Sequence, residues 1–205
     1  MTLFFMCLWV VLSVFILGIF VWTTRALQDQ KRIWAEFAAR RGLQCNRGTY
    51  FKSNTVRGKI GSYNFYLASE QRDSADLRGR TFVTVIQFEI PGTMPAPGVV
   101  ASGNYREYAS NLVVREALAI DHPGFTEGRV VVRADHAALV APYFTPDRLR
   151  ILDSLIKQKG LSVLFLFDID AIFLRLETVD PMLKPGQLDK TIDGILPMLQ
   201  VLASD

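Results

Sequence analysis

The sequence contains little of the chemistry from which disulfide frameworks, metal sites and catalytic centres are built. It has two cysteines and two histidines among 205 residues. Cys7 lies in an apolar run and Cys45 in a polar segment, so we do not expect them to form a disulfide with each other, which mildly favours a reducing compartment. Two thiols are also too few for a structural zinc site. We therefore expect neither a bound metal nor a cofactor.

Neither sign of charge is in large excess. The formal net charge is only +3 at pH 7, which is too small an excess to indicate a nucleic-acid-binding protein. Basic and aromatic residues do alternate in RGTYFKSNTVRGKIGSYNFY, as they can in proteins that bind single strands. A sheet edge beside a membrane explains the same alternation, and we expect no nucleic acid among the partners.

What the sequence does have is a long apolar run at its N-terminus. No charged residue occurs between Leu3 and Trp22. A helix of that length is about 30 Å long, which matches the hydrocarbon core of a bilayer. A cleaved signal peptide normally has basic residues before a shorter apolar core and a small-residue cleavage site after it, and neither occurs here. A buried core helix is the other alternative. We predict that residues 1–24 form a transmembrane anchor.

The flanking charges predict how this anchor is oriented. No charged side chain precedes the run, and basic residues outnumber acidic ones after it. The positive-inside rule then places the N-terminus outside and the rest of the chain in the cytoplasm. We expect Trp22, Arg25, Lys31 and Arg32 at the membrane interface, with the lipid bilayer as a partner. The basic residues of this flank are Arg25, Lys31, Arg32, Arg40, Arg41 and Arg47.

Residues 25–42 predict an amphipathic juxtamembrane helix. The segment is rich in helix formers, and Ile33, Trp34, Phe37 and Ala38 recur at helical spacing. Gly42 follows as a helix stop. This helix either continues the anchor as one rod or meets it at an angle near the interface. In both cases its apolar stripe should pack on the domain that follows.

Residues 43–205 predict a cytoplasmic α+β domain, in which two or three helices pack on an antiparallel sheet. GTYFKSN, TVRGKIG, SYNFYLASE and RTFVTVIQFEI are rich in β-branched and aromatic residues and are separated by glycines. Strands joined by short turns pair antiparallel. RVVVRA, at residues 129–134, predicts a further strand. For residues 106–128 the pattern leaves helix and strand open.

Two helices are predicted in the second half of the domain. In TPDRLRILDSLIKQKG, Thr145 is a capping residue, Pro146 takes the first helical position and Gly160 follows the end. The closing segment GQLDKTIDGILPMLQVLASD has one apolar stripe, which Pro197 should kink or interrupt. The residues expected to face the core are Leu149, Leu152, Leu155 and Ile156 in the first helix, and Leu188, Ile192, Ile195, Leu196, Leu199 and Leu202 in the second.

One stretch, VLFLFDIDAIF, matches the opening motif of haloacid-dehalogenase-like phosphotransferases. There an apolar strand leads into two aspartates, which would be Asp168 and Asp170 here. Such a fold needs a long α/β domain after the motif, and here only a loop and one helix follow. The flanking runs LSVLFLF and AIFLRLE instead predict a β-hairpin with the aspartates in its turn.

Two Asp-His pairs are the remaining weak candidates for chemistry: Asp121 with His122, and Asp135 with His136. An aspartate can orient an imidazole for base catalysis or for metal ligation. Pro123 and the glycine after it make a turn the plainer explanation of the first pair. The second pair also fits the start of a short helix with Asp135 as its cap, so we assign no catalytic, metal or cofactor-binding residue.

The order of features resembles a broad group of uncharacterised bacterial single-pass membrane proteins with a domain of unknown function. The similarity runs through the span, WAEFAARRGL, VRGKIGSYNFYL, RTFVTVIQFEIPG, DHPGFTEGRVVVRAD and LVAPYFTPDRLRILDSL, and includes Asp121-x-x-x-Phe125 and Thr145-Pro146-x-x-Leu149. It implies the same architecture, in the bacterial inner membrane, and says nothing about chemistry.

A chemistry-poor domain at a membrane address predicts an accessory or scaffold protein rather than an enzyme. Its anchor and its domain would both contact a membrane-protein partner. Two alternatives stay open. One is a ligand-binding or enzymatic module with an unrecognised site, and the other is a sensor of anionic lipid surfaces that uses the basic flank.

Overall fold

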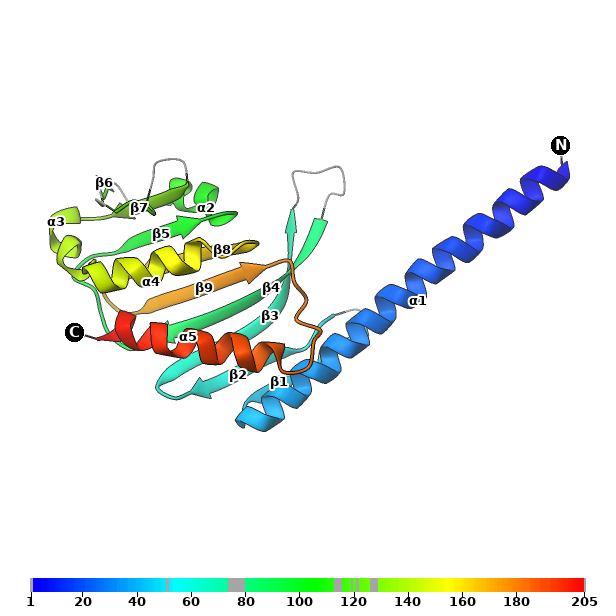
Figure 1. Cartoon of the computed structure of the whole chain (residues 1–205), viewed down its shortest axis with the longest axis horizontal. Coiled ribbons are helices and arrows are strands. Elements are labelled where there is room, and N and C mark those ends of the chain that lie inside the picture. The colour runs from blue at the N-terminus through cyan, green and yellow to red at the C-terminus, as the bar shows by residue number, and fades with distance from the viewer. Residues whose placement is uncertain are drawn as a thin grey trace.

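The computed structural model describes residues 2–50, 52–73, 80–112, 116–118, 120, 122–125 and 129–204. A long helix leads into a domain made of one sheet with helices packed on it (Figure 1). In chain order the elements are α1 (Thr2–Arg41), β1 (Gln44–Asn46), β2 (Thr55–Ile60), β3 (Tyr63–Asp73), β4 (Arg80–Ile90), β5 (Gly98–Ser102), α2 (Tyr105–Asn111), β6 (Glu116–Ala117), β7 (Val130–Ala134), α3 (Ala137–Val140), the 3₁₀ helix η1 (Ala141–Tyr143), α4 (Pro146–Ile156), β8 (Leu161–Phe167), β9 (Ile172–Thr178) and α5 (Gln187–Ala203).

The sheet has nine strands in the order β1-β2-β3-β4-β9-β8-β5-β7-β6. Each described pair of neighbours is antiparallel. The predicted α+β class with an antiparallel sheet is therefore confirmed. The order also shows that the hairpin of β8 and β9 inserts between β4 and β5, so the last strands of the chain lie in the middle of the sheet.

The main core lies between the sheet and three helices on one face, which we call the front face. Figure 1 shows α4 and α5 lying across this face, while the C-terminal part of α1 packs along its β1–β2 side. The expected core residues of α4 and α5 are buried, except Leu196, which is half-buried. Trp34 and Phe37 of α1 are fully buried in the same core, so the predicted apolar stripe does pack on the domain.

The predicted anchor and the predicted juxtamembrane segment form one uninterrupted helix. α1 runs from Thr2 to Arg41 and ends as predicted at Gly42, which has a positive φ of 64°. The amide of Gly42 donates to the carbonyl of Ala39 at 3.4 Å, and that of Leu43 donates to Ala38 at 2.8 Å. This pair of bonds is a Schellman motif, which gives the helix a fixed C-terminus. Of the two arrangements the sequence left open, the single rod is the one observed.

The opposite face, which we call the back face, carries the short helix α2. Its Tyr105 and Ala109 pack against Val99, Ala101 and Leu164, whereas Val100 belongs to the front core. Alternate residues of β5 therefore enter opposite cores, as the pleat of a strand requires. Helix α2 occupies part of the segment for which the sequence left helix and strand open, and β6 occupies another part.

Several local predictions are confirmed. Leu161–Phe167 and Ile172–Thr178 pair antiparallel, so Asp168 and Asp170 lie in the turn of a hairpin. The side chain of Thr145 accepts a hydrogen bond from the amide of Arg148 and caps α4. Pro197, however, does not interrupt α5, which continues to Ala203.

The predicted strand over GTYFKSN was wrong for its described residues. Asn54 accepts a hydrogen bond from the amide of Gly48 at 3.1 Å and donates one to the carbonyl of Lys31 at 2.9 Å. The amide of Lys52 donates to Thr49, which closes a turn. Bonds to α1 thus replace a strand ladder, and the edge strand is β1 instead, which the sequence analysis missed.

Candidate functional site

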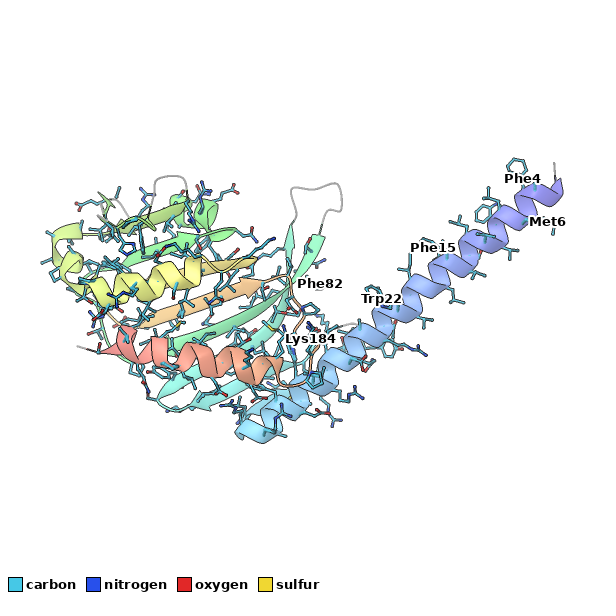
Figure 2. All side chains as sticks on the ribbon, viewed as in Figure 1. Phe4, Met6, Phe15, Trp22, Phe82 and Lys184 are labelled. Atoms are coloured by element: carbon cyan, nitrogen blue, oxygen red, sulfur yellow. The ribbon has the colours of Figure 1, made fainter. Side chains whose placement is uncertain are left out.

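The predicted interface residues all lie on α1, where the helix leaves the domain. Trp22 is 72 % exposed, and Figure 2 shows it pointing outward from the rod. Arg25 is exposed, and Arg32 pairs with Asp29 at 3.2 Å on the helix surface. Lys31 instead donates to the carbonyls of Thr49 and Tyr50, at 2.6 and 3.2 Å. Its ammonium group therefore joins the helix to the following loop.

The last two basic residues of α1 form ion pairs with α5. Arg40 contacts Asp189 at 2.7 Å, and Arg41 contacts Asp189 at 3.0 Å and Asp193 at 2.8 Å. Burial works against a charged Asp189, but the hydrogen bonds from the two arginines outweigh it and lower the pKa of this carboxyl. The pairs connect the end of α1 to the first turns of α5.

The histidine pairs do not form a site within the described part of the chain. Asp121 lies outside the described residues. His122 is part of a turn, as the plainer explanation held: its Nδ1 accepts from the amide of Gly124 at 3.2 Å. The described residues contain no group of His, Cys, Asp and Glu side chains that could hold a metal ion.

The second pair does begin a helix, but the predicted cap residue was wrong. His136 has a left-handed backbone and is the N-cap of α3, without a side-chain capping bond. The amide of Ala137 donates instead to the Glu116 carboxylate at 3.1 Å. The Glu116 side chain, from β6, thus caps the first turn of α3.

A polar cluster that the sequence analysis missed lies on the back face, where α2 meets the sheet. Its side chains come from three separate elements: Glu70 and Arg72 of β3, Arg175 and Glu177 of β9, and Tyr105 of α2. Residues two apart in a strand point to the same face, and the antiparallel register brings β3 and β9 to either side of β4. We call these five residues the back-face cluster.

Tyr105 is the centre of the cluster. Its hydroxyl accepts from Arg175 Nε at 2.7 Å and from Arg72 Nη2 at 3.4 Å, and its ring lies 5.4 Å from the Arg72 Cζ atom. Arg175 Nη2 also donates to Glu70 at 2.5 Å. Arg72 Nε donates to Glu177, which is only 1 % exposed, at 3.1 Å. Each guanidinium thus contacts one carboxylate and the shared tyrosine.

Burial and these contacts shift the pKa values of Tyr105 and Arg175. Burial raises the pKa of Tyr105 above its ordinary value and keeps the phenol neutral, although the Arg175 donor acts in the opposite direction. For Arg175, burial disfavours the charge, but the Tyr105 hydrogen bond and the Glu70 charge outweigh it and raise the pKa. Two arginines and two glutamates balance, so the cluster is a neutral, tightly bonded surface rather than an attractor for one sign of charge.

Two open cavities adjoin the cluster and share Arg72 and Tyr105 in their walls. The larger, about 790 Å³, extends over α2 past Asn104 and Tyr108. The smaller, about 400 Å³, extends over β8 and β9 past Leu166 and Phe173. Tyr108 lines both cavities and is half exposed. Tyrosine and arginine are enriched where proteins bind one another, so this face has the composition of a docking surface.

The sequence held one signal of this site. Charged residues alternate with leucines in IFLRLET, although β9 is the central strand of the sheet. Alternation of that kind indicates a sheet face without a hydrophobic cover. The partner strands and Tyr105 could not be identified from it, because that required the strand order.

The sequence matches no protein-family model and no curated protein. Among solved structures, the fold is similar to the crystal structure of the mycobacterial trehalose monomycolate transport factor A, TtfA, with a TM-score of 0.50 and 11 % sequence identity. The similarity covers 84 % of this chain and 94 % of that chain. This chain therefore shares a fold with a transport factor. It also has one described helix, at its N-terminus, that is long and apolar enough to cross a membrane.

Proposed function

We propose that this chain is a membrane-anchored accessory protein that holds its domain at a fixed height and orientation, so that the domain can dock on a membrane-protein partner. The N-terminal part of α1 spans the bacterial inner membrane with the N-terminus outside, and the domain lies in the cytoplasm. The name of TtfA, a transport factor, fits an accessory role of this kind.

The observation that carries the proposal is the continuity of α1. The helix that exposes Phe4 and Trp22 also places Trp34 and Phe37 in the domain core, with no break between them. A domain on a flexible linker would lose orientational freedom when it binds, whereas one fixed on a rod has lost that freedom already. Preorganisation of this kind favours docking beside the anchor.

The back-face cluster is the docking surface that we propose. The half-exposed Arg72 of the cluster and the neighbouring Tyr108 border two open cavities, whose walls also include the buried Tyr105. Because the cluster is internally neutral, its affinity for a partner would come from packing and hydrogen bonds rather than from long-range attraction. Arg40 and Arg41 are paired with α5, which weakens the alternative of a lipid-surface sensor built on the whole basic flank.

The side of the membrane on which the domain lies can be tested by cysteine labelling. Ile169 lies exposed in the β8–β9 turn, so Ile169→Cys, in a chain with Cys7 and Cys45 changed to Ser, should react with an impermeant maleimide only after spheroplasts are permeabilised. Ser13→Cys in the span should stay unreactive throughout, as a control. Labelling of Ile169→Cys in intact spheroplasts would place the domain outside and end the proposal.

The docking role can be tested by photocrosslinking in cells. A benzoylphenylalanine at Tyr108 should capture one membrane-embedded protein, and a probe at Phe15 in the span should capture the same protein. Leu139, 56 % exposed on α3, provides a matched control position that should capture nothing. The accessory role fails if Tyr108 and Leu139 give the same adducts, or if neither Tyr108 nor Phe15 gives any.

A further inference from the structure

A groove lies on the front face, where α1 separates from the sheet. It encloses about 670 Å³ between the Phe20–Gln30 stretch of α1, the ends of β3 and β4, and the connection from β9 to α5. Figure 2 shows Trp22 and Phe82 at this junction, on the two sides of the opening between the rod and the domain. Val83 and Val179 are the described residues that line both this groove and the larger cavity beside the back-face cluster.

The mouth of the groove exposes apolar side chains that the fold elsewhere buries. On the same face of β4, Thr84, Ile86 and Phe88 are at most 2 % exposed, whereas Phe82 is 64 % exposed. Val179, across the groove, is also 64 % exposed. An apolar patch that stays uncovered on an otherwise packed face marks a surface that contacts something else.

The deep end of the groove is polar and already hydrogen-bonded. Gln30 donates to the carbonyl of Pro181 at 3.1 Å and accepts from Ser53 at 2.6 Å, and Thr84 donates to the carbonyl of Asp180 at 2.8 Å. Among the described residues that line the groove, Lys52 is the one ionisable side chain. The groove thus runs from an apolar mouth to a polar end that carries a positive charge.

This change from apolar to polar lining along the groove matches the order of acyl chains and headgroup in a membrane phospholipid. Phe20 and Trp22 belong both to the apolar run and to the wall of the groove, and Gln30 lies about 15 Å further along the helix axis. If Trp22 marks the interface, the mouth lies at acyl-chain depth and Lys52 lies on the headgroup side. We propose that the groove holds one anionic phospholipid of the cytoplasmic leaflet, with its chains against Phe20 and Phe82 and its phosphate near Lys52.

This inference rests on the proposed insertion of α1 in the membrane, and the experiment reports on both. The full chain is reconstituted into nanodiscs of phosphatidylcholine with a minority of phosphatidylglycerol, one of the two lipids carrying an acyl-chain diazirine near the glycerol. After illumination, adducts are mapped on peptides. Adducts on the Phe4–Trp22 stretch report insertion. Adducts on peptides that contain Phe82 or Val179 report occupancy of the groove.

We expect groove adducts with the phosphatidylglycerol probe, and their loss in Phe82→Asp and Val179→Asp while the span adducts persist. Lys52→Gln should lower the phosphatidylglycerol adduct about fivefold and leave the phosphatidylcholine adduct unchanged, because one lysine at an anionic surface contributes an effect of that size. Ile169→Asp, at a similarly exposed apolar residue in the distant hairpin turn, should change nothing.

Span adducts without groove adducts would overturn the lipid site and leave the insertion of α1 intact. Equal labelling by both lipids would overturn the anionic preference. A benzoylphenylalanine at Phe82 that captures a protein in cells, and no lipid in nanodiscs, would assign the groove to a partner helix instead. Absence of span adducts would overturn the insertion itself.

Discussion

At the scale of single residues, Gly98 lies where the core leaves no room for a side chain. A Cβ at this position would lie 2.3 Å from one ring atom of Phe167 and 2.8 Å from the carbonyl oxygen of Arg133. Phe167 is 1 % exposed and cannot move aside without disturbing the core. We expect Gly98→Ala to lower the free energy of unfolding by about 3 kcal/mol, measured by denaturant unfolding of the full chain in mild detergent.

Gly194 provides the matched control for this substitution. It lies on the exposed side of α5, and a Cβ there would meet nothing within 4 Å. Gly194→Ala should therefore stabilise the chain by about 0.5–1 kcal/mol, because alanine favours a helix. If both variants moved the midpoint in the same direction, the packing of β5 against β8 described above would be wrong.

Glu177 is the second residue whose replacement should have a definite effect on stability. It is buried and accepts hydrogen bonds from Arg72 and from Asn104 Nδ2, both at 3.1 Å. We expect Glu177→Ala to cost about 2 kcal/mol, because it leaves two donors without their acceptor while water can still reach the half-exposed Arg72. Denaturant unfolding measures this loss. Glu89→Ala, which removes only an exposed bond from Asn64, should cost under about 0.5 kcal/mol.

At the scale of elements, the ends of α1 and α5 are held together by a pH-sensitive contact. The pKa of Asp189 is lowered in the folded chain, so its contribution is present above the unfolded pKa, about 4, and is lost as the pH falls through the folded value. Asp189→Asn should destabilise the chain by roughly 1 kcal/mol at pH 7 and by much less near pH 3. Unfolding curves of the two chains at both pH values check this, and a difference that grew at low pH would contradict it.

Elements were predictable from the sequence wherever local chemistry agreed with the tertiary structure. The α4 helix has its cap at Thr145 and its apolar face at helical spacing, and the hairpin around Asp168 is formed by two neighbouring runs. The strand prediction for GTYFKSN was wrong because its composition favours a strand, while hydrogen bonds through Lys31 and Asn54 hold its backbone against α1. That competition depends on a helix distant in sequence, so no local pattern could show it.

The back-face cluster was unpredictable for a similar reason. Its charged residues stand on strands that are distant in the chain, and Tyr105 lies on a helix that the pattern did not resolve. The histidines, which are rare in this sequence, lie in a turn and at a helix start. The back-face cluster is made of common residue types that the order of the strands brings together.

At the scale of the whole molecule, α1 is a rod that enters the domain core without a break. We expect that inserting Gly-Ser-Gly-Ser after Thr24 leaves the stability of the domain unchanged, because the insertion lies before the buried residues of α1. The same insertion should abolish the crosslink from Tyr108 to the partner. A crosslink of undiminished yield would show that orientation is irrelevant to docking.

The most direct test of the rod is a distance distribution between two spin labels in nanodiscs. The labels are placed at Ser13→Cys on α1 and Gln200→Cys on α5, both exposed, with Cys7 and Cys45 changed to Ser. We expect one narrow distance distribution for the native chain and a broad one for the chain with the four-residue insertion. A native distribution as broad as that of the insertion variant would contradict this expectation.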